Sequence, residues 1–254
     1  MQYATLIANI KARHFFGIAL VLSGICAFCR LLPTDDVFMR YAPAAEAFAG
    51  GDWKYAFHPR FGVYFTAFAG IFVSLFHCSG IAACQFVSVI FFSLAVFPLH
   101  ALFEKVWGQA TAFWGTLAYI FTSHLLRYAG EGLRDNGKTL ALALIALSLV
   151  SLTEKKSWKN VQILAAGGAL LTVIRGEGFL IAFLCGIVAL YILKDWKKSV
   201  AGIFLFLILI SPQCFYNYRV IGYFVPELRH GVILYRLGIP PARCATVKIP
   251  ETAR

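Results

Sequence analysis

Two adjacent carboxylates, Asp35 and Asp36, follow directly on an apolar run that extends from Phe15 to Leu32. Charge at the end of a membrane helix is costly unless it meets water, a partner or a substrate. A carboxylate here could ligate a metal, or could take the proton from an acceptor hydroxyl, which is otherwise a poor nucleophile. The alternative is a pair of solvated residues that cap the following helix.

Two arginines further along the chain, Arg134 and Arg175, are candidates for binding a phosphate, because a guanidinium meets phosphate oxygens in a bidentate fork. Each lies beside an acid, Asp135 and Glu177 respectively, so two local ion pairs between helices are an equally good explanation. Arg219 is a weaker candidate, for which anchoring at the membrane interface is a sufficient role.

His58, which precedes Pro59 in a polar connector, is a candidate substrate contact. Cys26 and Cys29 have the C-x-x-C spacing, but both lie inside the first apolar run with no histidine nearby. We therefore interpret them as small side chains at helix contacts rather than as a metal or redox site. The sequence contains no P-loop, dinucleotide fingerprint, H-E-x-x-H or G-x-S-x-G motif.

The composition is that of a membrane protein. The chain is 60% hydrophobic and 14% charged, with a mean hydropathy of +0.74, whereas soluble domains average about 25% charged residues. The apolar residues occur in long runs, which are typical of transmembrane helices. The net charge of +11 lies in short clusters between these runs. This pattern follows the positive-inside rule, so we expect membrane lipids and no nucleic acid as partners.

The apolar runs predict an all-α, polytopic helical bundle that forms a single transmembrane domain over residues 1–254. We expect an outer loop at 33–60 and an outer-face tail at 217–254. Thr34 or Asp35 would cap a surface helix through residue 49. The apolar runs are His14–Leu32, Phe61–His77, Ile81–Phe103, Thr111–Leu126, Thr139–Leu152, Val161–Ile174, Phe179–Leu193 and Ala201–Phe215.

That surface helix would carry Phe38, Tyr41, Ala45 and Phe48 on one face, at spacings of three or four residues.

Topology follows from the lysine-rich loops at 154–159 and 194–198. If both loops lie on the cytoplasmic side, as the N-terminus does, the chain must cross the membrane an even number of times before the loop at 154–159. The run at 61–77 is at the bottom of the spanning range, so we expect it to be re-entrant or surface-lying, which leaves seven crossings. The runs at 139–152 and 161–174 would each cover only about 21 Å. The charges beside them would then lie in a water-filled recess on the outer face.

Several segments, in their order and spacing, resemble membrane glycosyltransferases of the GT-C fold. These are the users of polyprenyl-phosphate sugars related to protein O-mannosyltransferases and to the lipid A aminoarabinose transferase. Two details depart from the family pattern: Arg60 replaces a proline, and Arg219 follows Asn217 instead of preceding it. The segments are Asp35 to Ala42 continuing to Ala47 and Gly50, His58-Pro59-Arg60-Phe61, Arg127 to Asn136, Thr172 to Gly178, and Pro212 to Pro226.

The resemblance implies transfer of a sugar from a polyprenyl-phosphate donor to a lipid, glycan or protein acceptor at the outer face of the cell (inner) membrane. Asp36, or Asp35, would then be the catalytic base, with Arg134 and Arg175 at the donor phosphate. Asp135 would assist if a divalent cation, Mg or Mn, is used; no cofactor is otherwise implied. The substrate contacts would be Tyr41, His58, Glu177 and Arg219.

Members of this family are usually longer than 254 residues, which predicts a minimal form, a fragment or a partner-dependent subunit. The competing hypothesis is a non-catalytic membrane protein, either a lipid transporter or a truncated scaffold relative. Inverted repeats or helices broken near the midplane would favour a transporter, and the sequence shows no convincing repeat.

Overall fold

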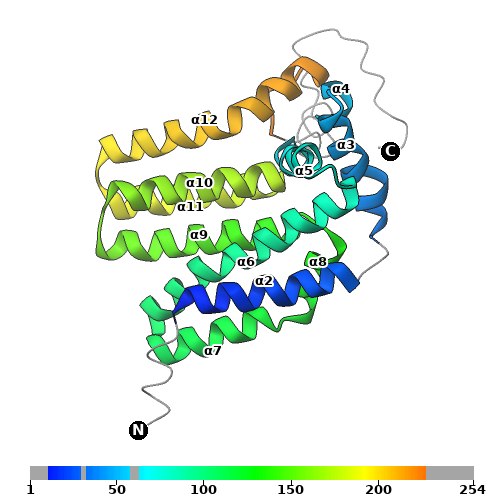
Figure 1. The fold of residues 1–254 in the computed structure, drawn as a ribbon. Helices are drawn as coiled ribbons and strands as arrows, with labels where there is room; N and C mark the ends of the chain where they lie inside the picture. The colour runs from blue at the N-terminus through cyan, green and yellow to red at the C-terminus, as the bar shows by residue number, and fades with distance from the viewer. Residues whose placement is uncertain (1–10, 30–32, 58–62, 227–254) are drawn as a thin grey trace, which may run out of the picture.

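The computed structural model describes residues 11–29, 33–57 and 63–226, and every regular element in these ranges is a helix (Figure 1). The predicted all-α class is therefore confirmed for this part of the chain. The elements are α2 (Ala12–Cys29), the π-helix η1 (Val37–Tyr41), α3 (Ala42–Ala49), α4 (Trp53–Ala56), α5 (Val63–Phe76), α6 (Gly80–Trp107), α7 (Gln109–Ile120), α8 (Ser123–Glu131), α9 (Asp135–Glu154), α10 (Trp158–Ile174), α11 (Gly178–Leu193) and α12 (Trp196–Ile221).

Most of the helices run between two common ends of the molecule. Figure 1 shows α2, α6, α7, α9, α10, α11 and α12 lying across the view in this way. At one end, Lys105 of α6 pairs with Glu154 of α9. The turns at 154–159 and 194–198 also lie there, and we call this the lysine-rich end.

At the opposite end, Arg175 pairs with Asp135, the first residue of α9. The segment that carries Asp35 and Asp36 lies at this end too, together with α3 and α4 (Figure 1). We call it the aspartate end. The bundle thus separates most of its lysines from its candidate catalytic carboxylates.

Four of the described helices are long and apolar enough to cross a membrane: α2, α6, α9 and α12. The 18 residues of α2 cover about 27 Å at about 1.5 Å per residue, close to the hydrocarbon thickness of about 30 Å. α5, α10 and α11 are apolar but shorter. The long apolar helices indicate a membrane protein, and the predicted number of crossings stays a prediction.

The segment predicted to be re-entrant or surface-lying folds as α5. Figure 1 shows α5 almost end-on while α6 and α10 lie across the view, so the axis of α5 runs across theirs. Its 14 residues cover about 21 Å, less than the bilayer core. α5 packs against α3 and α6 at the aspartate end. That the segment does not cross the membrane stays a prediction.

The run at 111–126, predicted as one helix, is divided between two helices. α7 ends at Ile120, and α8 begins at Ser123. The Thr122 hydroxyl donates a hydrogen bond to the carbonyl of Ala118, and such a bond competes with continuation of the helix. The polar side chains that follow, among them His124 and Arg127, are exposed at the aspartate end, where they reach water.

Two further helix lengths differ from the predictions. α9 has 20 residues instead of 14, because its first turn is built from polar residues that do not belong to the apolar run. It covers about 30 Å, so its length gives no support to a recess. α12 continues through Ile221, so Asn217 and Arg219 lie on a helix rather than in a tail.

The surface helix after the first apolar run forms, but its buried face differs from the predicted one. Residues 37–41 form a π-turn, η1, which inserts an extra residue into the helical repeat. Val37 and Tyr41 are therefore buried, whereas Phe38 is 59% exposed. The predicted cap also fails at Thr34, whose hydroxyl is buried without a hydrogen-bond partner.

The start of α6 fixes η1 and α3 against the bundle. The backbone N–H of Gly80 donates to Oε1 of Glu46 on α3 at 2.7 Å. A Cβ on Gly80 would lie 2.3 Å from the carbonyl oxygen of Ala42. Only glycine allows the two backbones to approach this closely.

We expect Gly80→Ala to lower the free energy of unfolding by about 1–3 kcal/mol, because the α3–α6 contact must open. Gly17→Ala on α2 is the matched control, since a Cβ there meets no atom within 4 Å. Alanine also has the higher helix propensity, so this control should be neutral or slightly stabilising. Thermal unfolding in detergent measures both, and equal midpoints for the two variants would contradict the close approach.

Candidate functional site

Tyr41, the last residue of the π-turn, is the centre of the candidate site. Its side chain is 5% exposed and packs edge-to-face against Phe65 of α5. The guanidinium carbon of Arg134 lies 5.6 Å from the centre of the tyrosine ring, within the range of a cation–π contact. The ring therefore joins the segment that follows α2 to the turn between α8 and α9.

Four charged groups act on Tyr41. Burial raises the pKa of its hydroxyl above the ordinary value; the charges of Arg134 and Arg175 lower it, and those of Asp36 and Asp135 raise it. The net direction is upward, so the tyrosine stays protonated and can donate a hydrogen bond. These four charged side chains are therefore within electrostatic reach of one ring, and Arg134 lies directly over it.

Arg175, directly after α10, joins two of the predicted residues. Its Nη2 lies 2.6 Å from Oδ1 of Asp135, and its Nη1 lies 3.7 Å from Oε1 of Glu177. Burial lowers the pKa of Arg175, but the nearby carboxylates of Asp135 and Glu177 raise it by more, so the net shift is upward. Nε is buried without a hydrogen-bond partner, so this cation retains an unused donor.

Asp36 forms an ion pair with Arg40 one turn later, at 2.8 Å, and both side chains are half exposed. Asp35 is also exposed. The two aspartates line an open depression of about 520 Å³, with Pro33, Thr34 and Leu133. Water and a solute can therefore reach both carboxylates.

The turn that carries Arg134 and Asp135 is held by hydrogen bonds from α6. The hydroxyl of Ser88 donates to the carbonyls of Tyr128 and Leu133, at 3.2 and 2.7 Å. Nδ2 of Asn136 donates in turn to the Ser88 hydroxyl at 3.1 Å. These bonds fix both ends of the turn.

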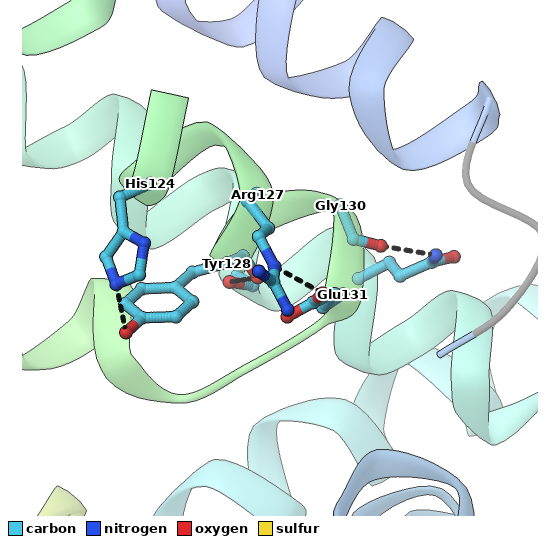
Figure 2. Close-up of polar contacts among 7 residues, drawn as sticks. His124, Arg127, Tyr128, Gly130 and Glu131 are labelled. Carbon is cyan, nitrogen blue, oxygen red and sulfur yellow. Dashed lines mark hydrogen bonds and ion pairs between the residues drawn. The ribbon is translucent and has the colours of Figure 1, made fainter. Parts of the chain in front are cut away.

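Figure 2 shows α8 beside this turn, with two side-chain pairs along it. Nε of Arg127 lies 2.8 Å from Oε1 of Glu131, whose side chain is only 3% exposed. The Tyr128 hydroxyl and Nε2 of His124 share a hydrogen bond of 2.7 Å. Beyond them, Nε2 of Gln85 donates to the Gly130 carbonyl at 2.7 Å. The buried Glu131 carboxylate is thus paired with a cation on its own helix, and the Gln85 bond joins the end of α8 to α6.

The structure brings together six of the residues predicted from the sequence. These lie at the aspartate end, in contact with one another or within electrostatic reach of Tyr41: Asp36, Tyr41, Arg134, Asp135, Arg175 and Glu177.

The other predicted residues lie outside this group. Asp35 shares the depression with Asp36. Arg219 is exposed in the last turn of α12, a position that suits the alternative role of interfacial anchor. His58 lies outside the described residues.

The predicted ion pairs are partly different. The alternative to phosphate binding was a local pair of Arg134 with its neighbour Asp135, but Asp135 pairs with Arg175 across two helices. Consecutive residues on a helix do not face each other. Within the described part of the chain, Arg134 has no carboxylate at ion-pair distance and rests on Tyr41 instead.

A metal does not fit this donor set. In the described ranges, no three His, Cys, Asp or Glu side chains gather closely enough to hold an ion. Asp135, the predicted ligand, is already paired with a guanidinium. Among the described residues Asp135 is therefore a partner of Arg175 and not part of a three-residue ligand cluster.

Two positioning residues, Ser88 and Gln85, were not anticipated from the sequence. They lie three residues apart inside the apolar run of α6, so both face the same side of that helix. A polar pair at this spacing in a membrane helix indicates a polar contact at that face. This spacing could have identified both residues from the sequence. The buried hydroxyl of Thr34 had no comparable signal.

We expect the Arg134–Tyr41 contact to be measurable by a double-mutant cycle in unfolding. Arg134→Gln should cost about 0.5–1 kcal/mol less in a Tyr41→Leu background than in the unmodified protein, because leucine has no π face. In a Tyr41→Phe background the cost should be unchanged, since the ring is kept. Equal costs in all three backgrounds would show that the cation and the ring do not interact.

A second and more enclosed cavity lies away from these residues, between α10, α11 and α12. Its lining is almost entirely apolar and carries none of the predicted site residues. Asp35 and Asp36 instead line the open depression at the aspartate end.

Comparisons of the chain with protein-family models, with curated proteins and with solved structures found no match.

Proposed function

We propose that this protein is a membrane glycosyltransferase of the GT-C type, which moves a sugar from a polyprenyl-phosphate donor to an acceptor. One observation carries the proposal. Asp36, Arg134, Asp135 and Arg175, from segments far apart in the chain, gather around Tyr41 at one end of the bundle. An accessible carboxylate and two guanidinium groups at one place are the groups that glycosyl transfer from a lipid phosphate needs.

In the proposed reaction, an acceptor hydroxyl or amine attacks the anomeric carbon of the donor sugar and inverts it. The new bond forms as the bond from that carbon to the phosphate oxygen breaks, and the lipid phosphate leaves with the electron pair. Asp36 takes the proton from the acceptor. Its exposure in the depression supports this role, because the acceptor must reach it.

Arg134 and Arg175 stabilise the negative charge that develops on the departing phosphate. Arg134 is suited to this role because its charge rests on an aromatic face rather than on a carboxylate. Arg175 keeps an unused Nε donor. Asp135 and Glu177 hold Arg175 in place, and the protonated Tyr41 hydroxyl provides one further donor beside the phosphate.

For the topology we propose seven crossings, by α2, α6, α7 together with α8, α9, α10, α11 and α12, with α5 lying across them at the aspartate end. The lysine-rich end would face the cytoplasm, in keeping with the positive-inside rule. The aspartate end would face the outer side of the cell (inner) membrane. Charge distribution and the course of the helices in Figure 1 support this orientation.

A non-catalytic membrane protein is the competing function. The 2.6 Å pair between Arg175 and Asp135 favours it, because a structural ion pair between helices explains both residues without a substrate. This alternative does not explain why the Asp36 carboxylate is exposed in a depression, or why Arg134 lies over an aromatic ring with no carboxylate at ion-pair distance among the described residues.

The test is incubation of the purified protein with labelled polyprenyl-phosphate sugars and with acceptor extracts, scored for released lipid phosphate and for labelled product. The proposal predicts time-dependent release that requires acceptor. Donor binding without any release, across the panel of sugars, would favour the non-catalytic alternative.

A further inference from the structure

The cavity between α10, α11 and α12 has a volume of about 350 Å³. Val161 and Gly168 of α10 lie on one side, and residues from Phe179 to Leu193 of α11 line its length. Fourteen residues separate the two ends of that α11 segment, about 21 Å along the helix axis. This exceeds the half-thickness of the hydrocarbon core, about 15 Å, so one lipid chain can lie inside it.

The lining excludes water as the occupant. Cavities with an apolar lining stay dry and take up apolar molecules, and the lining here is almost entirely apolar. Small residues keep it open: a Cβ on Gly186 would meet no atom within 4 Å, and Gly202 lies against Val161. A hydrocarbon chain matches both the shape and the chemistry of this space.

One end of the cavity is basic. Lys198 and Ser199 of α12 line it there. The two turns at this end of the bundle carry five more exposed lysines: Lys155, Lys156, Lys159, Lys194 and Lys197.

The acids beside this opening are already engaged. Glu154 pairs with Lys105, and Asp195 accepts hydrogen bonds from the first turn of α12 and pairs with Lys198 at 3.1 Å. The opening therefore keeps a net positive charge.

Trp158 and Trp196, which are 50% and 72% exposed, flank the same opening. Tryptophan at such positions is typical of the headgroup level of a membrane. Basic pockets between transmembrane helices bind anionic lipid headgroups. The charge also opposes a second copy of this chain, because a two-fold dimer on this face would bring two sets of lysines together.

We propose that this cavity binds a phospholipid with an anionic headgroup, taken from the leaflet at the lysine-rich end. One hydrocarbon chain lies between α10, α11 and α12, and the headgroup phosphate meets the lysines around Lys198. The site lies at the end of the bundle opposite to Asp36, and the inference does not depend on the proposed glycosyl transfer.

The experiment uses the full chain in nanodiscs of phosphatidylglycerol and phosphatidylcholine in equal amounts. After transfer to detergent, retained lipid is measured by mass spectrometry of the intact protein. The unmodified protein should retain phosphatidylglycerol over phosphatidylcholine. Equal retention of the two lipids, or a dimer that carries no lipid, would overturn the proposal.

Two pairs of variants separate charge from shape. Lys197→Gln with Lys198→Gln should reduce the preference for phosphatidylglycerol about tenfold. Lys11→Gln with Arg13→Gln removes the same charge beside α2 and should leave the preference unchanged.

Gly186→Phe fills the cavity and should abolish retention of both lipids. Gly24→Phe on α2, where a Cβ also meets nothing within 4 Å, should not. Equal behaviour within either pair would contradict the assigned site.

Discussion

Asp36→Asn is expected to reduce sugar transfer by about 10²–10⁴-fold, the usual contribution of a general base, while the protein still folds and inserts. The amide has nearly the same shape as the carboxylate but cannot accept the acceptor proton. The Asp36–Arg40 pair is half exposed, so its loss should change stability by no more than about 1 kcal/mol. The measurement is the rate of lipid-phosphate release by purified protein, with thermal unfolding of the same samples.

Asp52→Asn is the matched control for this variant. Asp52 lies at the same end of the bundle and caps α4 by accepting a hydrogen bond from the backbone N–H of Tyr55. Asparagine caps helices equally well, so activity should stay within a few-fold of the unmodified protein. Full activity in Asp36→Asn would refute its role as the base, and Asp35→Asn then tests the other candidate.

Arg175→Gln is expected to weaken donor binding by about tenfold to a hundredfold. A hydrogen bond to a charged group contributes about 1.5–3 kcal/mol, and each 1.4 kcal/mol changes affinity tenfold. Arg175→Lys should recover only part of the affinity, because lysine lacks the bidentate fork. Equilibrium binding of a labelled polyprenyl-phosphate sugar to the detergent-purified protein measures these differences.

Asp135→Asn distinguishes this role from a purely structural ion pair. If Arg175 only pairs with Asp135, removing either partner breaks the same contact, and the two variants should behave alike. If Arg175 binds the donor phosphate, Asp135→Asn frees the guanidinium and should keep or increase donor affinity. A parallel loss of affinity in both variants would contradict phosphate binding by Arg175.

Much of the helix arrangement could be predicted from the sequence, because hydrophobic runs and lysine clusters report on it directly. The runs located α2, α5, α6, α10 and α11 to within a few residues. Polar residues that begin or interrupt a helix were less predictable. Asp135 starts α9, and the segment at 121–122 divides one apolar run between α7 and α8. The position of such a helix end depends on where the chain reaches water, and an apolar run in the sequence does not indicate that position.

The partners within the candidate site were harder to predict than its members. Arg134, Asp135 and Arg175 were predicted from the sequence as site residues. Their pairing could not be predicted in the same way, because consecutive residues do not face each other on a helix surface. The pairing of Asp135 with Arg175 depends on α9 and α10 packing side by side. The position of Tyr41 depends on the π-turn, which has no clear sequence signal.

The most direct test of a single site around Tyr41 is an experimental structure of the protein with a non-transferable polyprenyl-phosphate sugar bound. We expect a phosphate within hydrogen-bond distance of the Arg134 and Arg175 guanidinium groups, with the sugar beside the Asp36 carboxylate. A phosphate bound at the lysine-rich end, or at the aspartate end but away from both arginines, would contradict it.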